Sequence, residues 1–474
     1  MTGARIAALL LLVAPAVLPL VFTIGVRPET VAMLLPTGFL LAGVAATASV
    51  ITHSGLVPWL IAVVITVNGL AVAGFVQRRR HSRRLVVFEP DRWVWVPGFA
   101  AAAAAVYGLT ELRRPDVGWD TRSIWFLHAR LVDGGGHTYV AAMHNGAYSF
   151  SHMEYPLLAP GAVADAWRVA GSRDYRLGQV LIGLLGASLL VVAGSLVGRV
   201  ARGRWRTPIG AALAVAVVLA AFGASGPYAS DGYVDLAAAA AALAAAVALL
   251  VLPVSSYISV VGVICAWVAG FAKTEGVIAV VAIGALAALR HLFDDVHRAA
   301  WPRRLSAAAG WGALVAGPPL FWLAFVTIER TGSTYYGGIA PDHLSALSRA
   351  HAALTSLVQH TWLFGWLVLL IAVGAIVLAR VRRRWGIGSP IWLTLLIGLY
   401  LAGLVLGYAT GPYAVHWWLA GSADRVTILP RLLLLTELAV IVSVALAGPP
   451  PPRDHSRPPP SAQANQTDQL PVPC

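Results

Sequence analysis

Long apolar runs alternate with short polar segments along almost the whole chain. The runs cover residues 4–25, 30–52, 55–76, 93–112, 176–198, 208–224, 233–252, 257–272, 277–291, 305–327, 362–379, 390–409 and 429–447. A helix needs about 20 consecutive apolar residues to cross the hydrocarbon core of a bilayer. The pattern therefore predicts an all-α, polytopic bundle of about 13 transmembrane helices without strands.

Arginine clusters divide these runs into groups. The clusters occupy residues 78–84, 199–206, 290–304 and 380–385. An even number of predicted spans separates each cluster from the next, so all of the clusters lie on one side of the membrane. Short arginine-rich loops mark the cytoplasmic side. The N-terminus and the loops that lie an odd number of spans from a cluster, such as 113–175, are therefore predicted to face the exterior.

The composition is typical of a membrane protein. Hydrophobic residues make up 58% of the chain, charged residues 12%, and the mean hydropathy is +0.74. A soluble chain carries about 25% charged residues. The net charge of +13 falls in loops between spans, so it indicates no nucleic-acid partner. The Ala, Arg, Gly and Pro bias favours a bacterial source, and we expect the bacterial plasma membrane.

The chain divides into three predicted parts. Residues 1–92 form a three-span extension with a cytoplasmic arginine-rich loop. Residues 93–447 form the transmembrane core, whose first external loop is 113–175. Residues 448–474 are polar and Pro-rich, which predicts a disordered cytoplasmic tail. Cys265 lies in an apolar run and Cys474 is the last residue, so no disulfide framework is predicted.

The external loop 113–175 concentrates polar side chains. They are Asp116, Asp120, Arg122, His128, His137, His144, His152, Glu154 and Tyr155. Apolar residues at helical spacing over 121–132 predict a short amphipathic helix that lies along the membrane surface, and a second helix is expected at about 161–170. Asp120 directly precedes the first helix, where a carboxylate caps a helix N-terminus, so capping is one interpretation of this residue.

Two further external segments place charges beside helix ends. Asp231 and Asp235 are four residues apart at the start of span 233–252, which predicts both carboxylates on one helix face. The two carboxylates either point into the interior of the bundle or interact favourably with the positive end of the helix dipole. Lys273, the only lysine of the chain, lies two residues before Glu275 at a turn between short spans. It is either a functional group near membrane depth or a solvated turn residue whose side chain snorkels.

The external side therefore gathers acids, histidines and a few cations. The cations on this side lie beside helix ends and are Arg122, Lys273 and Arg425. The cytoplasmic side contains only arginine clusters. Trp417 and Trp418, before the last span, are most simply part of an interfacial aromatic belt. A working site is predicted to face outward.

Four segments on this side carry a family resemblance. They are "GWDTRSIWFLHAR" with "HMEYPLLAP", "SDGYVDLAAAA", "FAKTEGV" and "SADRVTILP". In this order they resemble the GT-C superfamily of membrane glycosyltransferases, with its protein-mannosyltransferase-like and aminoarabinose-transferase-like branches. "FAKTEGV" exchanges the Lys and Thr of the family's Thr-Lys-Gly element and inserts a Glu, and Val426 replaces the Tyr of its Arg-Tyr-x-x-Pro element. Three spans before residue 90 are additional to the one span that the family has before its acidic loop.

The resemblance implies an inverting glycosyltransferase that moves a sugar from a polyprenyl-phosphate donor to a glycan, lipid or protein acceptor. Lys273 and Arg425 would bind the donor phosphate, because fixed cations stabilise charge that develops in the transition state. Asp120 would accept the proton of the acceptor, with Asp116 in reserve. The residues expected to position the substrates are Asp231, Asp235, Glu154, Tyr155, His152, Arg122 and Glu275.

No cofactor is expected, because cationic side chains can handle a leaving group with one phosphate. A divalent metal is not predicted: the nearest set, His144, His152 and Glu154, matches no zinc spacing. Three other functions stay open, namely a flippase or transporter of lipid-linked sugars, an oligosaccharide polymerase or ligase, and a non-catalytic scaffold of envelope synthesis. Transporters usually place their charges at the bilayer midplane, between inverted repeats.

Overall fold

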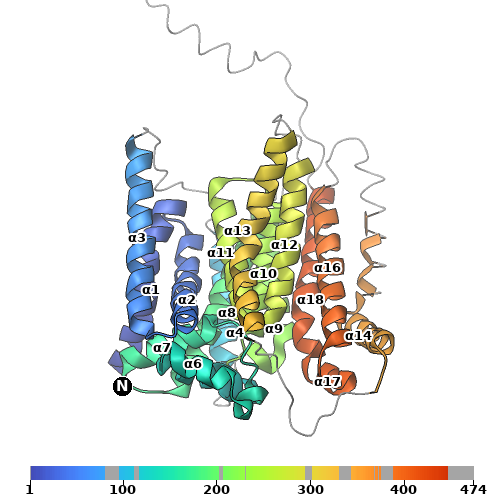
Figure 1. The fold of residues 1–474 in the computed structure, drawn as a ribbon. Helices are drawn as coiled ribbons and strands as arrows, with labels where there is room; N and C mark the ends of the chain where they lie inside the picture. The colour runs from blue at the N-terminus through green and yellow to red at the C-terminus, as the bar shows by residue number, and fades with distance from the viewer. Residues whose placement is uncertain are drawn as a thin grey trace, which may run out of the picture.

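The computed structural model is a bundle of helices, and the residues that it describes contain no strand (Figure 1). These residues are 2–80, 95–111, 117–201, 206–229, 231–293, 301–329, 343–363 and 388–446, with parts of 365–374. Nine helical segments among them are long and apolar enough to cross a membrane. The prediction of a multi-pass helical membrane protein is therefore confirmed.

The count of spans stays a prediction. The nine segments are Gly3–Ile24, Pro28–Ile51, Leu56–Gln77, Tyr175–Gly198, Thr207–Ser225, Thr274–Phe293, Trp301–Ile328, Pro390–Thr410 and Val415–Ser443. Three other predicted spans form shorter helical segments, which are Trp95–Glu111, Asp235–Val251 and Ser256–Ala272. Part of the predicted span 362–379, the arginine cluster 380–385 and the tail 448–474 lie outside the described residues.

The first helices pack closely against the first external loop. They are α1 (Thr2–Ile24), α2 (Pro28–Ile51) and α3 (Leu56–Arg80). A Cβ added at Gly43 of α2 would lie 2.8 Å from Cα of Leu158, the first residue of α7 (Leu158–Ala170). A Cβ added at Gly161 would lie 2.7 Å from the carbonyl oxygen of Ala42. Backbone therefore meets backbone where α2 crosses α7.

The loop 117–175 folds as a series of short helices. They are a π-helix (Thr121–Phe126), α5 (Leu127–Asp133), α6 (Gly136–Met143), a 3-10 turn (Gly146–Ser151) and α7. The predicted helix at 121–132 is thus present in two segments, and α7 begins three residues before the predicted 161. The apolar side chains of the helix at 121–132, however, are buried in the protein. Trp125, for example, stacks on Tyr155 with ring centroids 5.5 Å apart. The apolar face therefore packs on protein and not on lipid, whereas the orientation of this helix along the membrane surface stays a prediction.

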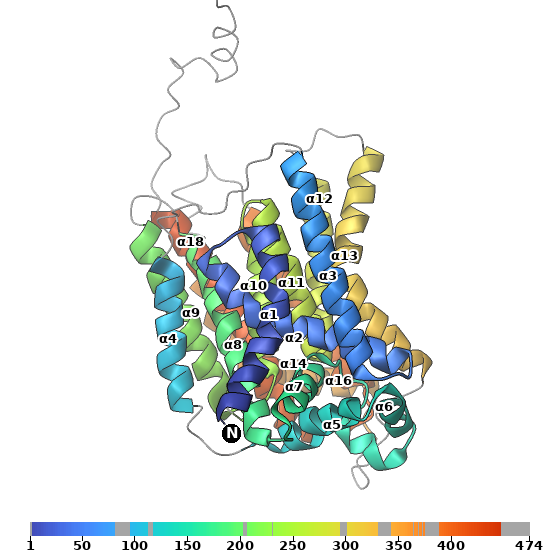
Figure 2. The same ribbon diagram turned by 90° about the vertical axis from the view of Figure 1, so that its left-hand side faces the viewer.

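The two ends of the bundle differ in character (Figures 1 and 2). The N-terminus, α5, α6, α7 and α17 (Val415–Val426) gather at one end, the loop end. Arg5, near the N-terminus, pairs there with Asp174, the N-cap of α8 (Tyr175–Gly198). At the other end, the arginine end, Arg199 donates to Glu29 at the start of α2 at 2.6 Å. The described arginines of the first three clusters lie at this end, as the charge pattern predicts.

A tight helical hairpin presents Lys273 at the loop end. α10 (Asp235–Ala246) continues as a π-helix (Val247–Val251), and α11 (Ser256–Ala272) and α12 (Thr274–Phe293) follow. Lys273 alone separates α11 from α12, and its backbone is extended, with φ −160° and ψ 157°. A Cβ added at Gly276 would lie 1.9 Å from the carbonyl oxygen of Ala269. Glycine at position 276 is therefore what allows α12 to turn back directly onto α11.

The last helices complete the bundle. They are α13 (Trp301–Ile328), α14 (Ala346–Thr361), α16 (Gly388–Thr410), α17 and α18 (Ile428–Leu446); α4 (Trp95–Glu111) and α9 (Arg206–Ser225) lie beside α8. Arg349 of α14 is buried and donates to the carbonyl oxygens of Tyr408 and Gly411 at 2.9 and 2.8 Å. These bonds satisfy carbonyl groups at the C-terminal end of α16. They fix α14 and the start of the α17 segment at the loop end.

Candidate functional site

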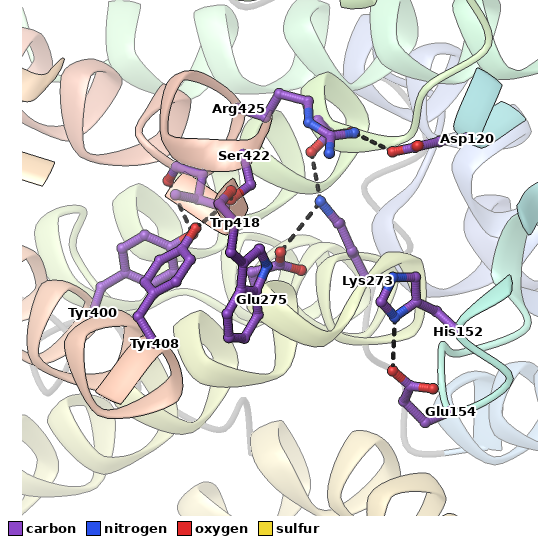
Figure 3. A network of polar contacts seen from close by, with 12 residues as sticks. Asp120, His152, Glu154, Lys273, Glu275, Tyr400, Tyr408, Trp418, Ser422 and Arg425 are labelled. Carbon is purple, nitrogen blue, oxygen red and sulfur yellow. Dashed lines mark hydrogen bonds and ion pairs between the residues drawn. The ribbon is translucent and has the colours of Figure 1, made fainter. Parts of the chain in front are cut away.

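Lys273 lies in a buried cluster of charges (Figure 3). Its ammonium group donates to Oδ1 of Asp235 at 2.7 Å and lies 3.2 Å from Oε1 of Glu275. Lys273 and Asp235 are each 5% exposed. A buried charge is stable only when it is paired and hydrogen-bonded. The two carboxylates therefore hold the lysine at the junction of α11 and α12.

Arg425 of α17 joins the same cluster from the other end of the chain. Its Nη1 donates to the carboxylate of Asp120 and lies 3.9 Å from Oδ2 of Asp235. The guanidinium carbon also lies 5.0 Å from the ring centroid of Tyr233 and 5.7 Å from that of Tyr228. Cation–π contacts of this kind stabilise a partly desolvated arginine. Asp235 is thus the acid that contacts both cations.

A cavity of about 530 Å³ opens beside the cluster. Its lining consists of Trp119, Asp120, Ile124, His152, Tyr155, Lys273, Glu275, Tyr413, Trp417, Trp418, Ala420, Gly421, Ser422 and Arg425. Asp235 is absent from this lining and lies behind the two cations. The cavity therefore presents cations, two acids and several aromatic rings to whatever enters it at the loop end.

Hydrogen bonds and stacking fix the loop that forms one wall. Nδ1 of His152 is 3.0 Å from Oε1 of Glu154, and the imidazole stacks on Tyr155 with centroids 4.9 Å apart and planes 13° apart. The indole of Trp322, on α13, donates to the carbonyl oxygen of Glu154 at 2.9 Å. His152 has φ 53° and ψ 58°, a left-handed conformation that is uncommon for a residue with a side chain. The wall is thus held by α13 as well as by its own contacts.

Two tyrosines near the charged cluster, Tyr155 and Tyr233, stay uncharged. Burial, followed by the charges of Glu275 and Glu154, raises the pKa of Tyr155 well above its ordinary value. Burial and the charge of Asp120 raise the pKa of Tyr233 to about 12, against the opposing effect of Arg425. Both phenols are therefore hydrogen-bond donors and apolar surfaces near neutral pH, and neither supplies an anion.

Most of the predicted site residues meet here. Asp120, Lys273, Glu275 and Arg425 line the cavity with His152 and Tyr155, Asp235 lies behind the cations, and Glu154 bonds to His152. Asp116 lies outside the described residues. Asp120 does not cap the helix that follows it, because it makes no capping hydrogen bond and pairs with Arg425 instead. The capping interpretation is therefore wrong.

Two predicted positions, Arg122 and Asp231, do not line the cavity. Arg122 donates from Nε to the carbonyl oxygen of Val117 at 3.1 Å and does not line the cavity. Asp231 lies in the turn before α10, which begins at Asp235, so helical spacing does not put the two on one face. The carbonyl oxygen of Asp231 accepts from Gly118 and Thr121 at 3.1 and 2.7 Å. It ties the second external turn to the π-helix that begins beside Asp120.

Some cavity residues were not predicted as site residues. Tyr413 and Trp418 line the cavity, and Tyr228 and Tyr233 contact Arg425. Trp418 was interpreted only as part of an interfacial belt. The sequence gives one signal for the two tyrosines, since both lie within the acidic segment "GPYASDGYVD", on either side of Asp231. Within the described ranges no three His, Cys, Asp or Glu side chains are grouped so that they could hold a metal ion.

His128 makes this loop sensitive to acid. The imidazole is buried and lies 3.2 Å from the hydroxyl of Tyr139. Burial lowers the pKa of His128 from 6.5 to about 3, so below pH 6.5 the unfolded chain binds a proton that the folded chain excludes. The stabilising effect of the neutral imidazole is complete above pH 6.5, and we expect stability to fall by about 1.4 kcal/mol for each pH unit below it. Thermal unfolding of the detergent-solubilised protein between pH 7.5 and pH 5 measures this slope.

The slope is assigned by two variants. His128→Gln should unfold at a lower temperature overall but lose much of the pH dependence in this range, whereas His144→Gln, at a more exposed loop histidine, should keep it. An unchanged slope in His128→Gln would show that other groups cause the acid sensitivity.

Comparisons with known proteins add no identity to this geometry. No protein-family model, no curated protein and no solved structure matches the chain. The function is therefore inferred from the residues of the cavity and from the arrangement of the helices.

Proposed function

We propose that this protein is a membrane glycosyltransferase that moves a sugar from a polyprenyl-phosphate donor to a hydroxyl acceptor. The observation that carries the proposal is the convergence of Lys273, Arg425, Asp120 and Glu275 at one cavity of about 530 Å³, with a third carboxylate, Asp235, behind the two cations. The cavity lies at the loop end, opposite the arginine end that the charge rule assigns to the cytoplasm. The reaction would then take place at the exterior surface of a bacterial plasma membrane.

The two cations are arranged to receive a phosphate. Asp235 contacts both of them from behind the cavity, at 2.7 Å from Lys273 and 3.9 Å from Arg425. Asp120 and Glu275 contact them along the cavity. A donor phosphate that enters the cavity competes with Asp120 and Glu275 for the same N–H groups, while Asp235 keeps both cations in place. Arginine supplies a planar fork and lysine a point charge, a combination that suits phosphate oxygens.

The reaction itself increases the charge that these cations stabilise. The donor carries its sugar on a phosphodiester with one negative charge, and transfer leaves a phosphomonoester with up to two. Fixed cations in a partly dry site stabilise such developing charge better than water does. An apolar polyprenyl chain would remain in the lipid, with its phosphate at the headgroup level, which is where a site at one end of the bundle can reach it. A transporter, by contrast, is expected to hold its charges near the midplane.

Donor turnover tests the proposal. Purified protein in lipid nanodiscs is supplied with polyprenyl-phosphate sugars that are labelled in the sugar, and with envelope material as acceptor. We expect label to move to the acceptor and polyprenyl phosphate to appear. Arg425→Gln should lower the rate by about 10²–10³-fold, the usual effect of losing one donor to a developing anion. Arg168→Gln, which breaks an ion pair with Asp133 in the external loop, should leave the rate unchanged.

Two results would overturn the proposal. One is that wild-type protein binds the labelled polyprenyl-phosphate sugars but transfers sugar from none of them. The other is movement of intact donor across the bilayer of proteoliposomes in place of transfer, which would identify a flippase.

A further inference from the structure

His152 and Glu154 form a pair that is poised over the cavity and that the phosphate contacts do not use (Figure 3). Three contacts fix the imidazole: Nδ1 bonds Oε1 of Glu154 at 3.0 Å, one face stacks on Tyr155 at 4.9 Å, and the ring meets Tyr413 edge-on at 6.0 Å. Among the described residues, Nε2 of His152 has no hydrogen-bond partner. The ring is therefore held in one orientation with its second nitrogen unoccupied.

The surroundings place this pair beside the proposed donor site. His152 lines the same cavity as Lys273 and Arg425. Glu154 lines an adjoining cavity of about 180 Å³, whose wall also includes His152, Tyr155 and Glu275. The second carboxylate oxygen of Glu154 is buried and has no partner in the described part of the chain. A positive charge on the bonded imidazole would stabilise such a buried carboxylate.

The backbone of His152 supports a role beyond packing. Its left-handed conformation costs about 1 kcal/mol or more for a residue with a Cβ, and such strain persists only where the surroundings impose it. The hydrogen bond from Trp322 of α13 to the carbonyl oxygen of Glu154 is one of the contacts that impose it. The fold thus maintains a strained residue in order to hold this ring at the cavity.

We propose that His152 is the base that accepts the proton of the acceptor hydroxyl, and that Glu154 positions the imidazole and stabilises its protonated form. This inference rests on the proposed transferase function. In the step, the acceptor O–H bond breaks and its proton passes to Nε2 of His152. The acceptor oxygen forms a bond to C1 of the sugar, and the bond from C1 to the phosphate oxygen breaks, with its electron pair passing to the phosphate. The proton later leaves His152 to water.

This assignment gives Asp120 a different role from the one predicted for it. One carboxylate oxygen of Asp120 accepts a hydrogen bond from Arg425, so this acid is already engaged with a cation of the proposed donor site. Nε2 of His152, by contrast, has no hydrogen-bond partner among the described residues. Asp120 instead balances the charge of Arg425 until the donor phosphate arrives.

Acceptor and donor kinetics of matched variants test the inference. We expect His152→Ala to lower kcat by about 10²–10⁴-fold, the usual contribution of a general base, with donor affinity unchanged. The unfolding temperature should fall moderately, because Glu154 and Tyr155 lose their contacts with the ring. Added imidazole should restore part of the rate. Glu154→Gln should lower kcat with little change in KM, and Glu154→Asp should recover part of it. His144→Ala, a loop histidine that pairs with Glu329, is the control and should behave as wild type.

The outcomes separate this inference from the function on which it rests. If wild type transfers sugar and His152→Ala does so within about threefold, or loses rate without rescue by imidazole, the base role is wrong and the transferase function stands. The same conclusion follows if Asp120→Asn loses kcat at full donor affinity while His152→Ala does not. If wild type itself transfers nothing from donors that it binds, the proposed function fails first.

Discussion

Replacing Lys273 by methionine is expected to lower donor turnover by at least about 100-fold, because one of the two cations that stabilise the leaving phosphate is lost. The same change should destabilise the protein by about 3–5 kcal/mol, since it leaves the buried carboxylate of Asp235 without its partner at 2.7 Å. Arg425, at 3.9 Å from Asp235, replaces only part of that contact. Donor binding, transfer rate and thermal unfolding in detergent are the measurements.

A double variant distinguishes the two effects of this substitution. In Lys273→Met with Asp235→Leu the unpaired buried acid is removed as well, so stability should return close to that of wild type. Transfer should stay low, because the cation is still missing. Unchanged donor affinity in the folded double variant would contradict the assignment of Lys273 to the phosphate.

Gly276→Ala is expected to damage the site without removing any charge. An added Cβ would lie 1.9 Å from the carbonyl oxygen of Ala269 and 2.7 Å from its carbonyl carbon. Backbone cannot rotate away as a side chain can, so α12 must move relative to α11. Overpacking of this kind costs about 1–3 kcal/mol, and a displacement of about 1 Å at a reacting group can reduce the rate about 100-fold. We expect both losses, in thermal unfolding and in transfer.

The same helix offers a matched control. At Gly284 an added Cβ has its nearest neighbour at 3.4 Å, which is an ordinary contact. Gly284→Ala should therefore keep the transfer rate within about twofold of the wild-type rate. Its thermal unfolding temperature should be equal to or higher than that of wild type, because alanine favours helix more than glycine does. Equal behaviour of the two variants would show that the close contact at Gly276 does not position Lys273 and Glu275.

The sequence predicts the positions of the helices better than it predicts which side chains contact one another. Hydropathy alone predicts the nine described segments that could cross a membrane. The extended Lys273 lies between α11 and α12, at the turn where the pattern places it. Because an even number of predicted spans separates the arginine clusters, Asp120, Lys273 and Arg425 are predicted on the same side of the membrane. Nothing in the pattern says that Asp120 bonds Arg425, 305 positions later, and not the backbone of its own helix. That choice depends on how α17 packs, which is a long-range property.

The errors of prediction have local physical causes. Helical spacing predicts Asp231 and Asp235 on one face, but Gly232, with φ 83°, turns the backbone, and α10 begins only at Asp235. The apolar face of 121–132 was expected on the membrane surface because amphipathic helices commonly lie there. Here α7 and α8 cover it instead, and Phe126 packs edge-on against Trp167 at 5.6 Å. A hydropathy pattern shows that a face is buried, and it does not show whether lipid or protein buries it.

The backbone contact between α2 and α7 has a consequence for how the protein is made. The chain leaves the ribosome from its N-terminus, so α1, α2 and α3 are synthesised before the residues that carry Asp120 and His152. The surface of α2 at Gly43, against which the backbone of Leu158 packs, is thus already synthesised when the following loop emerges. A chain that started at residue 93 would contain every charged residue of the cavity. It would nevertheless lack the surface on which the wall of that cavity is assembled.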